Sequence, residues 1–293
     1  MKNWTEKAIE KFLALSAGIT ILTTLGILWV LFSESIDFFS EISILSFLTD
    51  TEWNPANEQN PKYGVLVLLS GTLLTTFIAV CLAVPIGLVI AVFLREYASD
   101  KIRRILKPLL ELLAAVPTVV YGYFALAVLT PFLRLLLPDL PLFNALSAGI
   151  VMSIMILPII SSLSEDALNA VPKSLREASY GLGATTLQTA FRVVVPSASS
   201  GIMVSIILGI SRAIGETMIV VMAAGTKPQL TFNPLESVMT ITTYMAETAS
   251  GDVEFGSLRY KSIFAVGMAL FVFTFILNSI SFYIKRRFHA QYE

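Results

Sequence analysis

The sequence predicts an all-α membrane protein with six transmembrane helices. The chain is 55% hydrophobic and only 14% charged, with a mean hydropathy of +0.77, whereas an average soluble domain carries about 25% charged residues. Six apolar stretches are long enough for a helix to cross the hydrocarbon core, which takes about 20 residues. Lys and Arg are also divided unevenly between the segments that connect these stretches, as in chains that cross a membrane several times.

The six stretches are separated by more polar segments and are expected to cross the membrane in succession. They are residues 12–32, 63–94, 112–133, 140–164, 197–226 and 262–284. The first follows a basic N-terminus, but it is longer than the apolar part of a signal peptide and no small-x-small cleavage pattern follows it. We therefore expect an uncleaved anchor helix. The second is long enough to tilt or to extend beyond the bilayer.

Two of these stretches contain two prolines each. Pro117 and Pro131 fall in the third, and Pro141 and Pro158 fall in the fourth. Proline removes a backbone hydrogen bond, and a membrane tolerates the freed carbonyl where protein or a cavity surrounds it. The prolines therefore indicate either irregular helices around an internal path or ordinary kinks.

The distribution of positive charge predicts that both termini are cytoplasmic. Most of the 20 Lys and Arg residues fall in alternate connecting segments, beginning with the N-terminus. These segments are residues 2–11, 95–107, 173–192 and 285–287. Short cytoplasmic segments of membrane proteins are enriched in Lys and Arg. We therefore expect a multi-pass protein of the cell (inner, cytoplasmic) membrane, surrounded by membrane lipid.

Two segments on the opposite, outer side are long enough to have structure of their own. Residues 33–62 are acidic, and residues 225–261 are expected to contain a short helix at 235–248, with Pro234 and Glu236 at its start. Both are candidates for docking an outer partner, although solvated connections would have a similar composition. The chain is accordingly divided into two parts. They are an anchor helix with its acidic outer loop, residues 1–62, and a core, residues 63–293.

The composition gives no support for an enzyme, a metal protein or a nucleic-acid binder. The formal net charge is −1, so bulk charge indicates no nucleic-acid partner. Cys81 lies in an apolar run and is expected to be a small buried side chain, and His289 lies in the polar tail. The sequence contains no G-x-x-x-x-G-K-[ST] nucleotide-binding loop and no recognisable hydrolase arrangement. We expect no catalytic residue, no metal and no cofactor on this chain.

Two charged residues, Arg212 and Glu216, lie near the centre of the fifth stretch. A central Arg costs roughly 2.5–3.5 kcal/mol on insertion scales, so such residues usually face protein or water. Because they are four residues apart, they share one helix face and can form an ion pair. On a continuous helix they belong to a narrow stripe of small and polar residues. The stripe consists of Gly201, Ser205, Gly209, Arg212, Glu216 and Ala223.

This pair has two interpretations. It could be a structural ion pair that locks two helices together. Alternatively, Arg212 lines the path of an anion, since its planar guanidinium presents paired donors to an oxyanion. Glu216 would then hold Arg212 in place and weaken anion binding enough for release. The hydroxyls of Thr118, Tyr121 and Thr217 are further candidates for this path, although such groups in membranes often bond locally.

The polar segment 165–196, between the fourth and fifth stretches, lies on the cytoplasmic side according to the charge distribution. Helical spacing extends over residues 173–191 with a break at Gly181 and Gly183, which predicts two short helices joined by a turn. On physical grounds alone, this segment could be an amphipathic helix lying on the membrane surface.

The same segment resembles a motif of importer permeases of the ATP-binding-cassette (ABC) class. In that motif, EAA is followed after three residues by Gly, and after nine more by I-x-L-P. This chain has EAS at 177–179, Gly183 at the matching distance and VVVP ending at Pro196, so the departures are conservative in size. The resemblance implies a coupling helix at about 173–191 that inserts into a groove of a separate ATPase subunit. The residues implied at this contact are Glu177, Ala178, Gly183 and Pro196.

A finer resemblance covers nearly the whole chain. The runs VPTVVYG (116–122), ILPII (156–160), SEDAL (164–168) and RAIGETM (212–218) are similar to those of the phosphate importer permeases. Ile214, Met218 and the additional N-terminal span favour the PstC type over the PstA type. The resemblance implies a type I ABC importer permease fold, MetI-like, with its core in the last five spans.

The resemblance also implies a function and partners. The function is import of inorganic phosphate, driven by ATP hydrolysis on other chains. The partners are a second, PstA-like permease, two PstB-like ATP-binding subunits that carry ATP and Mg, and a PstS-like phosphate-binding protein on the outer face. ATP binding closes the ATPase dimer, moves the coupling helices and opens the spans outward, and hydrolysis resets the inward-facing state.

Other interpretations stay open at this stage. The chain could be the permease for another oxyanion, such as molybdate, sulfate or phosphonate. It could be a secondary transporter or channel without an ATPase, in which case Glu177 and Gly183 should tolerate substitution. It could also be a structural or assembly subunit in which Arg212 and Glu216 are only a packing pair.

Overall fold

The computed structural model describes residues 4–57 and 59–289, and its regular structure is almost entirely helical. Lys2 and Glu58, which contributed to the charge pattern, lie outside the described residues. The N-terminal elements are α1 (Trp4–Glu41), α2 (Ile44–Thr49), β1 (Trp53–Asn54), β2 (Lys62–Tyr63) and α3 (Val65–Val92), which continues into the π-helix η1 (Phe93–Tyr97). The middle elements are α4 (Asp100–Ala115), α5 (Thr118–Phe124), η2 (Ala125–Leu129), α6 (Thr130–Arg134) and α7 (Ala145–Ala170).

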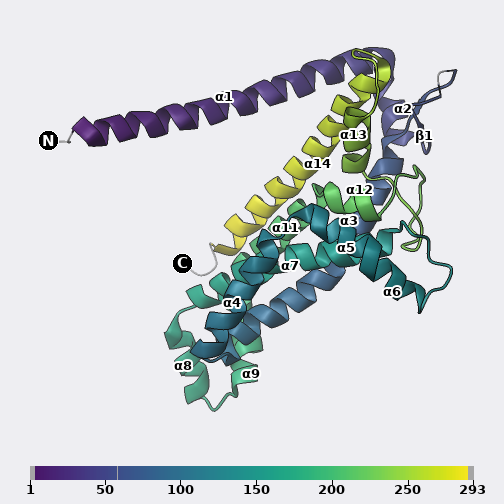
Figure 1. The fold of residues 1–293 in the computed structure, drawn as a ribbon. Coiled ribbons are helices and arrows are strands. Elements are labelled where there is room, and N and C mark those ends of the chain that lie inside the picture. Colours follow the sequence, from purple (N-terminus) through teal and green to yellow (C-terminus); the bar gives the residue numbers. More distant parts are fainter. Residues whose placement is uncertain (1–3, 58, 290–293) are drawn as a thin grey trace.

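The remaining elements complete the chain. They are α8 (Lys173–Gly181), α9 (Thr186–Thr189), η3 (Ala190–Val194), α10 (Val195–Ser197), α11 (Ser199–Ile214), α12 (Met218–Ala223), α13 (Ile241–Ser250) and α14 (Leu258–His289). Figure 1 shows α8 and α9 at one end of the fold, and α2, β1 and α13 at the opposite end. The N-terminal end of α1 extends away from the other helices.

The helices agree with the prediction of an all-α membrane protein. Among the described residues, four helices are long and apolar enough to cross a membrane, or up to six spans if each of two bent pairs counts as one. The four are Ala8–Glu41, Val65–Tyr97, Ala145–Ala170 and Leu258–Ile280. The bent pairs are Asp100–Ala115 with Thr118–Arg134, at 89°, and Thr186–Ser197 with Ser199–Ile214, at 73°.

The first helix is longer than predicted, and the acidic outer segment is partly helical. α1 continues to Glu41 because Phe38 near its end is fully buried in an aromatic cluster. Other members of this cluster, joined by edge-to-face ring contacts, are Phe39, Phe47, Trp53, Tyr63 and Tyr244. The antiparallel pairing of β1 with β2 places Trp53 opposite Tyr63, and burial raises the pKa of Tyr63 to about 12, so its hydroxyl stays protonated.

The third predicted span is not one helix. Its first four residues belong to α4, and the chain then turns by 89° before α5. Pro117 lies at the turn with an extended ψ of 136°, because a residue before the first helical turn needs no helical backbone. The Tyr121 hydroxyl donates a 2.7 Å hydrogen bond across the turn to the Leu113 carbonyl.

The other prolines have smaller effects. Pro131 is the second residue of α6, which continues directly from the π-helix η2 with helical backbone on both sides. Pro141 precedes α7, which begins after the Asn144 cap and continues through Pro158 without interruption. Cys81 is exposed on α3, contrary to the prediction of a buried side chain, because it lies on a face that no other part of the described chain covers.

The fifth predicted span is also interrupted. α11 ends at Ile214 and α12 begins at Met218, with Gly215, Glu216 and Thr217 between them. The helical wheel that placed Ala223 on one stripe with Arg212 assumed an unbroken helix, so that part of the prediction is wrong.

The outer helix begins later than predicted. The structure has α13 at Ile241–Ser250, with Thr240 as its N-cap accepting from the Thr243 N–H. Pro234 and Glu236 lie in a preceding turn instead, which the Asn233 side chain organises by bonding to the Leu235 N–H and to Glu236. Thr is a favoured N-cap residue, so the sequence offers two possible helix starts, and the helix begins after Thr240.

The core of the fold is the contact between α3 and α7. A Cβ added at Gly149 would lie 2.6 Å from Ile78, and one at Gly87 would lie 2.9 Å from Ile160. These distances are shorter than real Cβ contacts, so the two helices approach closely because both positions lack a side chain. Buried residues of α5, α11 and α12 pack around this pair.

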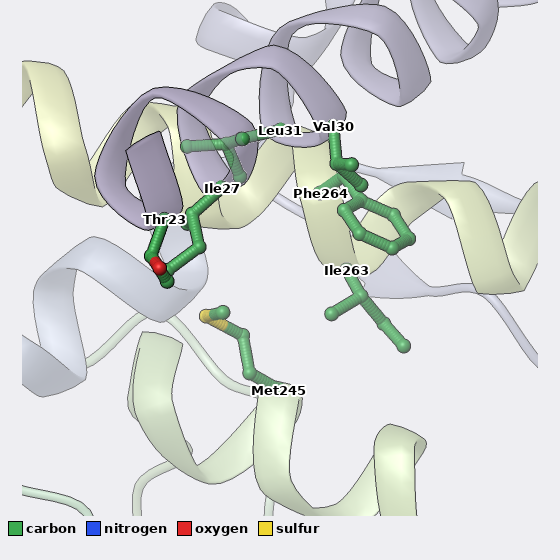
Figure 2. Close-up of a pocket in the computed structure, with 8 residues that line it drawn as sticks. Thr23, Ile27, Val30, Leu31, Met245, Ile263 and Phe264 are labelled. Atoms are coloured by element: carbon green, nitrogen blue, oxygen red, sulfur yellow. The ribbon is translucent and has the colours of Figure 1, made fainter. Parts of the chain in front are cut away.

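A groove of about 520 Å³ lies between α1, α13 and α14 (Figure 2). Its lining residues are Thr23, Gly26, Ile27, Val30, Leu31, Met245, Ile263 and Phe264. Figure 2 shows the Thr23, Ile27, Met245 and Ile263 side chains around the opening. The lining contains no charged group, so this groove is not suited to an inorganic anion.

Candidate functional site

The interruption between α11 and α12 holds Arg212 and Glu216 together. The Arg212 Nη1 atom donates to Glu216 Oε2 at 2.7 Å, as expected from the i, i+4 spacing. The two partners differ in environment: the Arg212 side chain is 41% exposed, whereas the Glu216 side chain is 2% exposed. Glu216 is therefore fixed inside the fold, and Arg212 reaches from it toward an open face.

Glu216 also supports the start of α12. Its second carboxylate oxygen, Oε1, accepts the backbone N–H groups of Met218 at 3.1 Å and Ile219 at 3.3 Å. These N–H groups have no intrahelical partner, and a carboxylate there is stabilised by the helix dipole. The Glu216 carbonyl accepts a 2.7 Å hydrogen bond from the Thr242 hydroxyl of α13. The carboxylate is thus held by an arginine and a helix N-terminus together.

The predicted polar stripe is only partly preserved. Ser205 and Gly209 on α11 are buried, as a protein-facing stripe requires. Ser205 shares a 2.7 Å hydrogen bond with Ser164 of α7, and a Cβ at Gly209 would lie 2.8 Å from Ile160. This part of the stripe is the contact surface for α7. Arg212 lies beyond this contact and is exposed.

Of the three candidate hydroxyl residues, only Thr217 lies in the interruption itself. Thr217 is the residue before α12, with a φ of −114°. Thr118 and Tyr121 lie on α5, which packs against α12 so closely that a Cβ at Gly122 would meet the Met218 carbonyl at 3.1 Å. The Tyr121 hydroxyl is already bonded to Leu113 O, so it stabilises the α4–α5 bend. A role of these hydroxyls in an anion path stays a prediction.

The polar segment forms the two short helices that were predicted, and the turn between them depends on Gly183. Gly183 has a φ of +82°, a conformation that residues with a Cβ rarely adopt. Its N–H donates to Tyr180 O at 2.9 Å, and the Ala184 N–H donates to Ser179 O at 3.2 Å. This pair of bonds is a Schellman motif, which ends α8.

α9 begins immediately after this turn. The Thr185 hydroxyl accepts from the Gln188 N–H, and the Gln188 side chain accepts from the Thr185 N–H, which is a capping box. The T-x-x-Q pattern is visible in the sequence and could have located this helix start. The inner sides of the two helices are joined by a buried 2.9 Å hydrogen bond between Ser179 and Thr189.

The motif residues lie at exposed positions of this helical hairpin and of the short helix α10 that follows it. Glu177, Ala178, Gly183 and Pro196 are all exposed. Large apolar side chains lie on the same hairpin, with Leu182 at 90% exposure, and Leu187 and Phe191 also exposed. An apolar surface of this kind is typical of a protein–protein contact. No atom within 4 Å would obstruct a Cβ at Gly183.

Three ion pairs that involve buried carboxylates were not found by the sequence reasoning. Arg176 of α8 pairs with Glu96 of η1 at 3.1 Å, and both side chains are buried. Glu165 of α7 is also buried and lies 3.1 Å from Lys107 and 3.6 Å from Arg103. The partners are far apart in the chain, so no local pattern points to them. Within the described residues, no group of three His, Cys, Asp or Glu could hold a metal ion.

Comparison with known proteins identifies the family. Residues 83–290 match the family described as "Binding-protein-dependent transport system inner membrane component". The chain belongs to this family. It is therefore a transport subunit of the inner membrane, and the resemblance noted from the EAA-type segment is confirmed.

Individual relatives and structures agree with this assignment. The phosphate transport system permease protein PstC of Mesorhizobium japonicum is 36% identical to this permease over 94% of the chain and 89% of its own length. The probable ABC transporter permease protein YqgH of Bacillus subtilis is 37% identical over 84% of the chain and 79% of its own length.

A solved structure supports the fold over nearly the entire permease. A chain of a bacterial alginate ABC transporter, 17% identical, superposes with a TM-score of 0.65 and covers 98% of both chains. At this identity the likeness concerns the fold alone. The predicted type I, MetI-like importer permease fold is thereby confirmed.

Proposed function

We propose that this permease is the PstC-type subunit of an ATP-driven importer that carries inorganic phosphate into the cytoplasm. The observation that carries the proposal is the Arg212–Glu216 pair, which presents a partly exposed guanidinium at an interruption of a membrane helix. The 36% identity to a phosphate permease over 94% of the chain supports phosphate as the substrate.

Phosphate would bind Arg212 from its open side. Within the described residues, Arg212 has one hydrogen-bonded partner, Glu216, through Nη1. A guanidinium has five N–H donors in a planar fork, so donors are left for the oxygens of an anion. The buried Glu216 carboxylate keeps part of the positive charge compensated. A site with this compensation binds an anion weakly enough to release it on the other side.

The α8–α9 hairpin would receive the force for transport. Its exposed apolar face around Leu182 and Phe191 fits a groove on an ATP-binding, PstB-like subunit, with ATP and Mg on that partner. Glu177 and Ala178 lie on the same hairpin, and Pro196 lies on the short helix α10 that follows it. The hairpin and both termini would then be cytoplasmic, as the positive charge of the connecting segments also indicates.

The other partners follow from the same assembly. A PstA-like permease would complete the translocation path, and Arg212 would face it across the path. A PstS-like binding protein would deliver phosphate at the outer end, where α2, β1 and α13 gather (Figure 1). Membrane lipid would surround the exposed apolar helices. The anchor helix with its outer segment, residues 1–62, and the core, residues 63–293, would serve as separate parts of this assembly.

The test is phosphate uptake by the reconstituted complex. Arg212→Ala should abolish uptake while the complex still assembles, because the buried Glu216 carboxylate keeps the Met218 and Ile219 N–H groups as donors. Arg212→Lys keeps the charge without the planar fork, and should retain a small fraction of the uptake. Arg104→Ala removes an exposed positive charge on α4 and serves as the control. Normal uptake by Arg212→Ala would refute the proposal.

The same vesicles test the substrate and the orientation. Uptake of labelled phosphate should be unaffected by excess molybdate or sulfate, whereas competition by either would favour a permease for that oxyanion. A cysteine placed at the exposed Arg104 of α4, in a Cys81→Ser background, should react with an impermeant thiol reagent only from the ATP-binding side. Labelling from the outer side would refute the proposed orientation.

A further inference from the structure

A buried arginine fastens the exposed hairpin to two of the spans. Arg176 of α8 donates from Nη1 to the Val171 carbonyl at 2.6 Å and from Nη2 to the Leu168 carbonyl at 2.7 Å. These carbonyls belong to the C-terminal end of α7. The Nε atom of Arg176 donates to Glu96 Oε1 at 3.2 Å, and its Nη2 atom lies 3.1 Å from the same oxygen.

This contact is rigid for two reasons. The Arg176 and Glu96 side chains are only 9% and 6% exposed, so water does not compete for their bonds. The guanidinium is planar, and its three nitrogens are all engaged, which fixes its orientation as well as its position. It also donates to carbonyls at the end of α7, where the Leu168 carbonyl accepts a long, 3.4 Å bond from the Val171 N–H as well. The α8 backbone next to Glu177 is therefore held at a fixed distance from α7 and η1.

The packing beneath the hairpin extends the same connection. The buried residues Leu168 and Val171 lie in one apolar cluster with Ala91 and Val92 of α3 and with Ala190 and Val194 of the hairpin. Arg103 of α4 donates to the Leu94 carbonyl in η1 at 2.6 Å, two residues before Glu96, and pairs with Glu165 of α7. The start of the bent third span thus joins the same junction.

We infer that Arg176, with Glu96, is the positioning residue that makes α8 move as one body with the cytoplasmic ends of α3 and α7. This inference rests on the proposed function, since it assigns the source of the force to an ATP-binding subunit on α8. A displacement of α8 by the ATP-binding subunit also displaces α7 and η1, because the Arg176 guanidinium is bonded at once to the Leu168 and Val171 carbonyls and to Glu96. The hairpin's own Gly183 turn lies on the far side of this junction from the spans.

A purely structural role predicts a different outcome, and a matched pair of apolar residues separates the two. Breaking a buried ion pair on one side leaves an uncompensated charge and destabilises the fold, whereas replacing both partners by apolar residues is often neutral for stability. The Arg176→Met/Glu96→Leu double variant therefore should assemble normally. If the pair only stabilises, this variant also transports normally.

The experiment uses the full complex in vesicles, with phosphate uptake and ATP hydrolysis measured on the same sample. In the double variant, phosphate taken up per ATP hydrolysed should fall about 2- to 30-fold, the range of coupling changes found for residues that link two sites. Glu96→Gln keeps the shape and an acceptor oxygen, so it should give a smaller loss of the ratio, but it leaves the Arg176 charge uncompensated and should unfold at a lower temperature than the double variant. Arg104→Met, at an exposed position of α4 outside the hairpin, is the control and should leave the ratio unchanged.

A distance measurement gives a readout that does not depend on the substrate. Spin labels at Leu182, the residue that follows α8, and at the exposed Val89 of α3 should keep one separation when ATP is added to the unmodified complex. In the double variant that separation should change on ATP addition. The inference would be overturned if the double variant took up as much phosphate per ATP as the unmodified complex, and if ATP left the label separation unchanged in both the double variant and the unmodified complex. A lack of phosphate uptake by the unmodified complex would instead refute the proposed transport, and the label distances would still decide the role of Arg176.

Discussion

Replacing Gly183 by Ala should weaken the turn of the α8–α9 hairpin without touching any neighbour. The φ of +82° lies in the left-handed region, which costs a residue with a Cβ about 1–2 kcal/mol. Nothing lies within 4 Å of the position that the new Cβ would occupy, so the cost is conformational and no clash adds to it. The Schellman bonds of the Gly183 and Ala184 N–H groups depend on this conformation.

Hydrogen exchange of these two amides measures the effect. An opening that is easier by about 1–2 kcal/mol should speed their exchange about 5- to 30-fold. Gly181→Ala is the matched control, since Gly181 also has no atom within 4 Å but ends the helix without a positive φ. That substitution should slow exchange slightly, because Ala is the better helix former. Equal exchange in Gly183→Ala and the wild type would refute the reasoning.

The same position also tests contact with an ATP-binding subunit. Asn tolerates the left-handed conformation better than other residues, so Gly183→Asn should restore most of the turn while it adds a side chain at the exposed face. If the turn alone matters, coupling of ATP hydrolysis to uptake follows the exchange rates. If the face is a close contact, Gly183→Asn and Gly183→Glu both uncouple, with Glu the more severe. Full coupling in Gly183→Glu would contradict the docking of this face.

Three further predictions concern other parts of the fold. Glu216→Ala should lower the free energy of unfolding by about 0.5–2 kcal/mol, the usual cost of a lost N-cap. Glu216→Gln keeps an acceptor, so its thermal unfolding should be near that of the wild type while its phosphate uptake falls. If both variants unfolded at the same temperature, Glu216 would not cap α12. Thr189→Val leaves the buried Ser179 hydroxyl without its partner and should cost about 1–3 kcal/mol, most of which the Ser179→Ala/Thr189→Val double variant should recover in a thermal-unfolding cycle. Gly149→Ala should destabilise by about 1–3 kcal/mol through overpacking against α3, whereas Gly18→Ala, which meets no atom within 4 Å, should leave the unfolding midpoint unchanged.

The sequence was most informative where a physical property is additive along the chain. Apolar length predicted the spans, because the cost of placing a residue in hydrocarbon is summed residue by residue. It was least informative about helix ends. α1 continues to Glu41 because Phe38 is buried by residues from α2 and β2, and α13 starts at Thr240 because that hydroxyl caps it. Hydropathy contains neither piece of information.

In the candidate site, too, the sequence predicted local contacts but not contacts between distant parts of the chain. The four-residue spacing of Arg212 and Glu216 predicted their ion pair, since that spacing is local. The interruption at Gly215 could not be predicted from a wheel that assumes a continuous helix. The pair of Arg176 with Glu96 joins residues 80 positions apart in the chain, so it follows from how α8 folds back on η1 and from no motif.

The interruption changes what the Arg212–Glu216 pair can do. On an unbroken helix, both side chains could leave the pair equally well. In the structure, the Glu216 carboxylate also accepts the first N–H groups of α12, and its carbonyl accepts from Thr242. Moving Glu216 would uncap α12 and break its link to α13, whereas moving Arg212 breaks one hydrogen bond at a partly exposed face. If Arg212 binds the anion as we propose, the anion would compete with Glu216 for Arg212 while the carboxylate keeps its bonds to α12. The guanidinium would then recover its partner when the anion leaves, which would reset the site without any change in the helix that carries it.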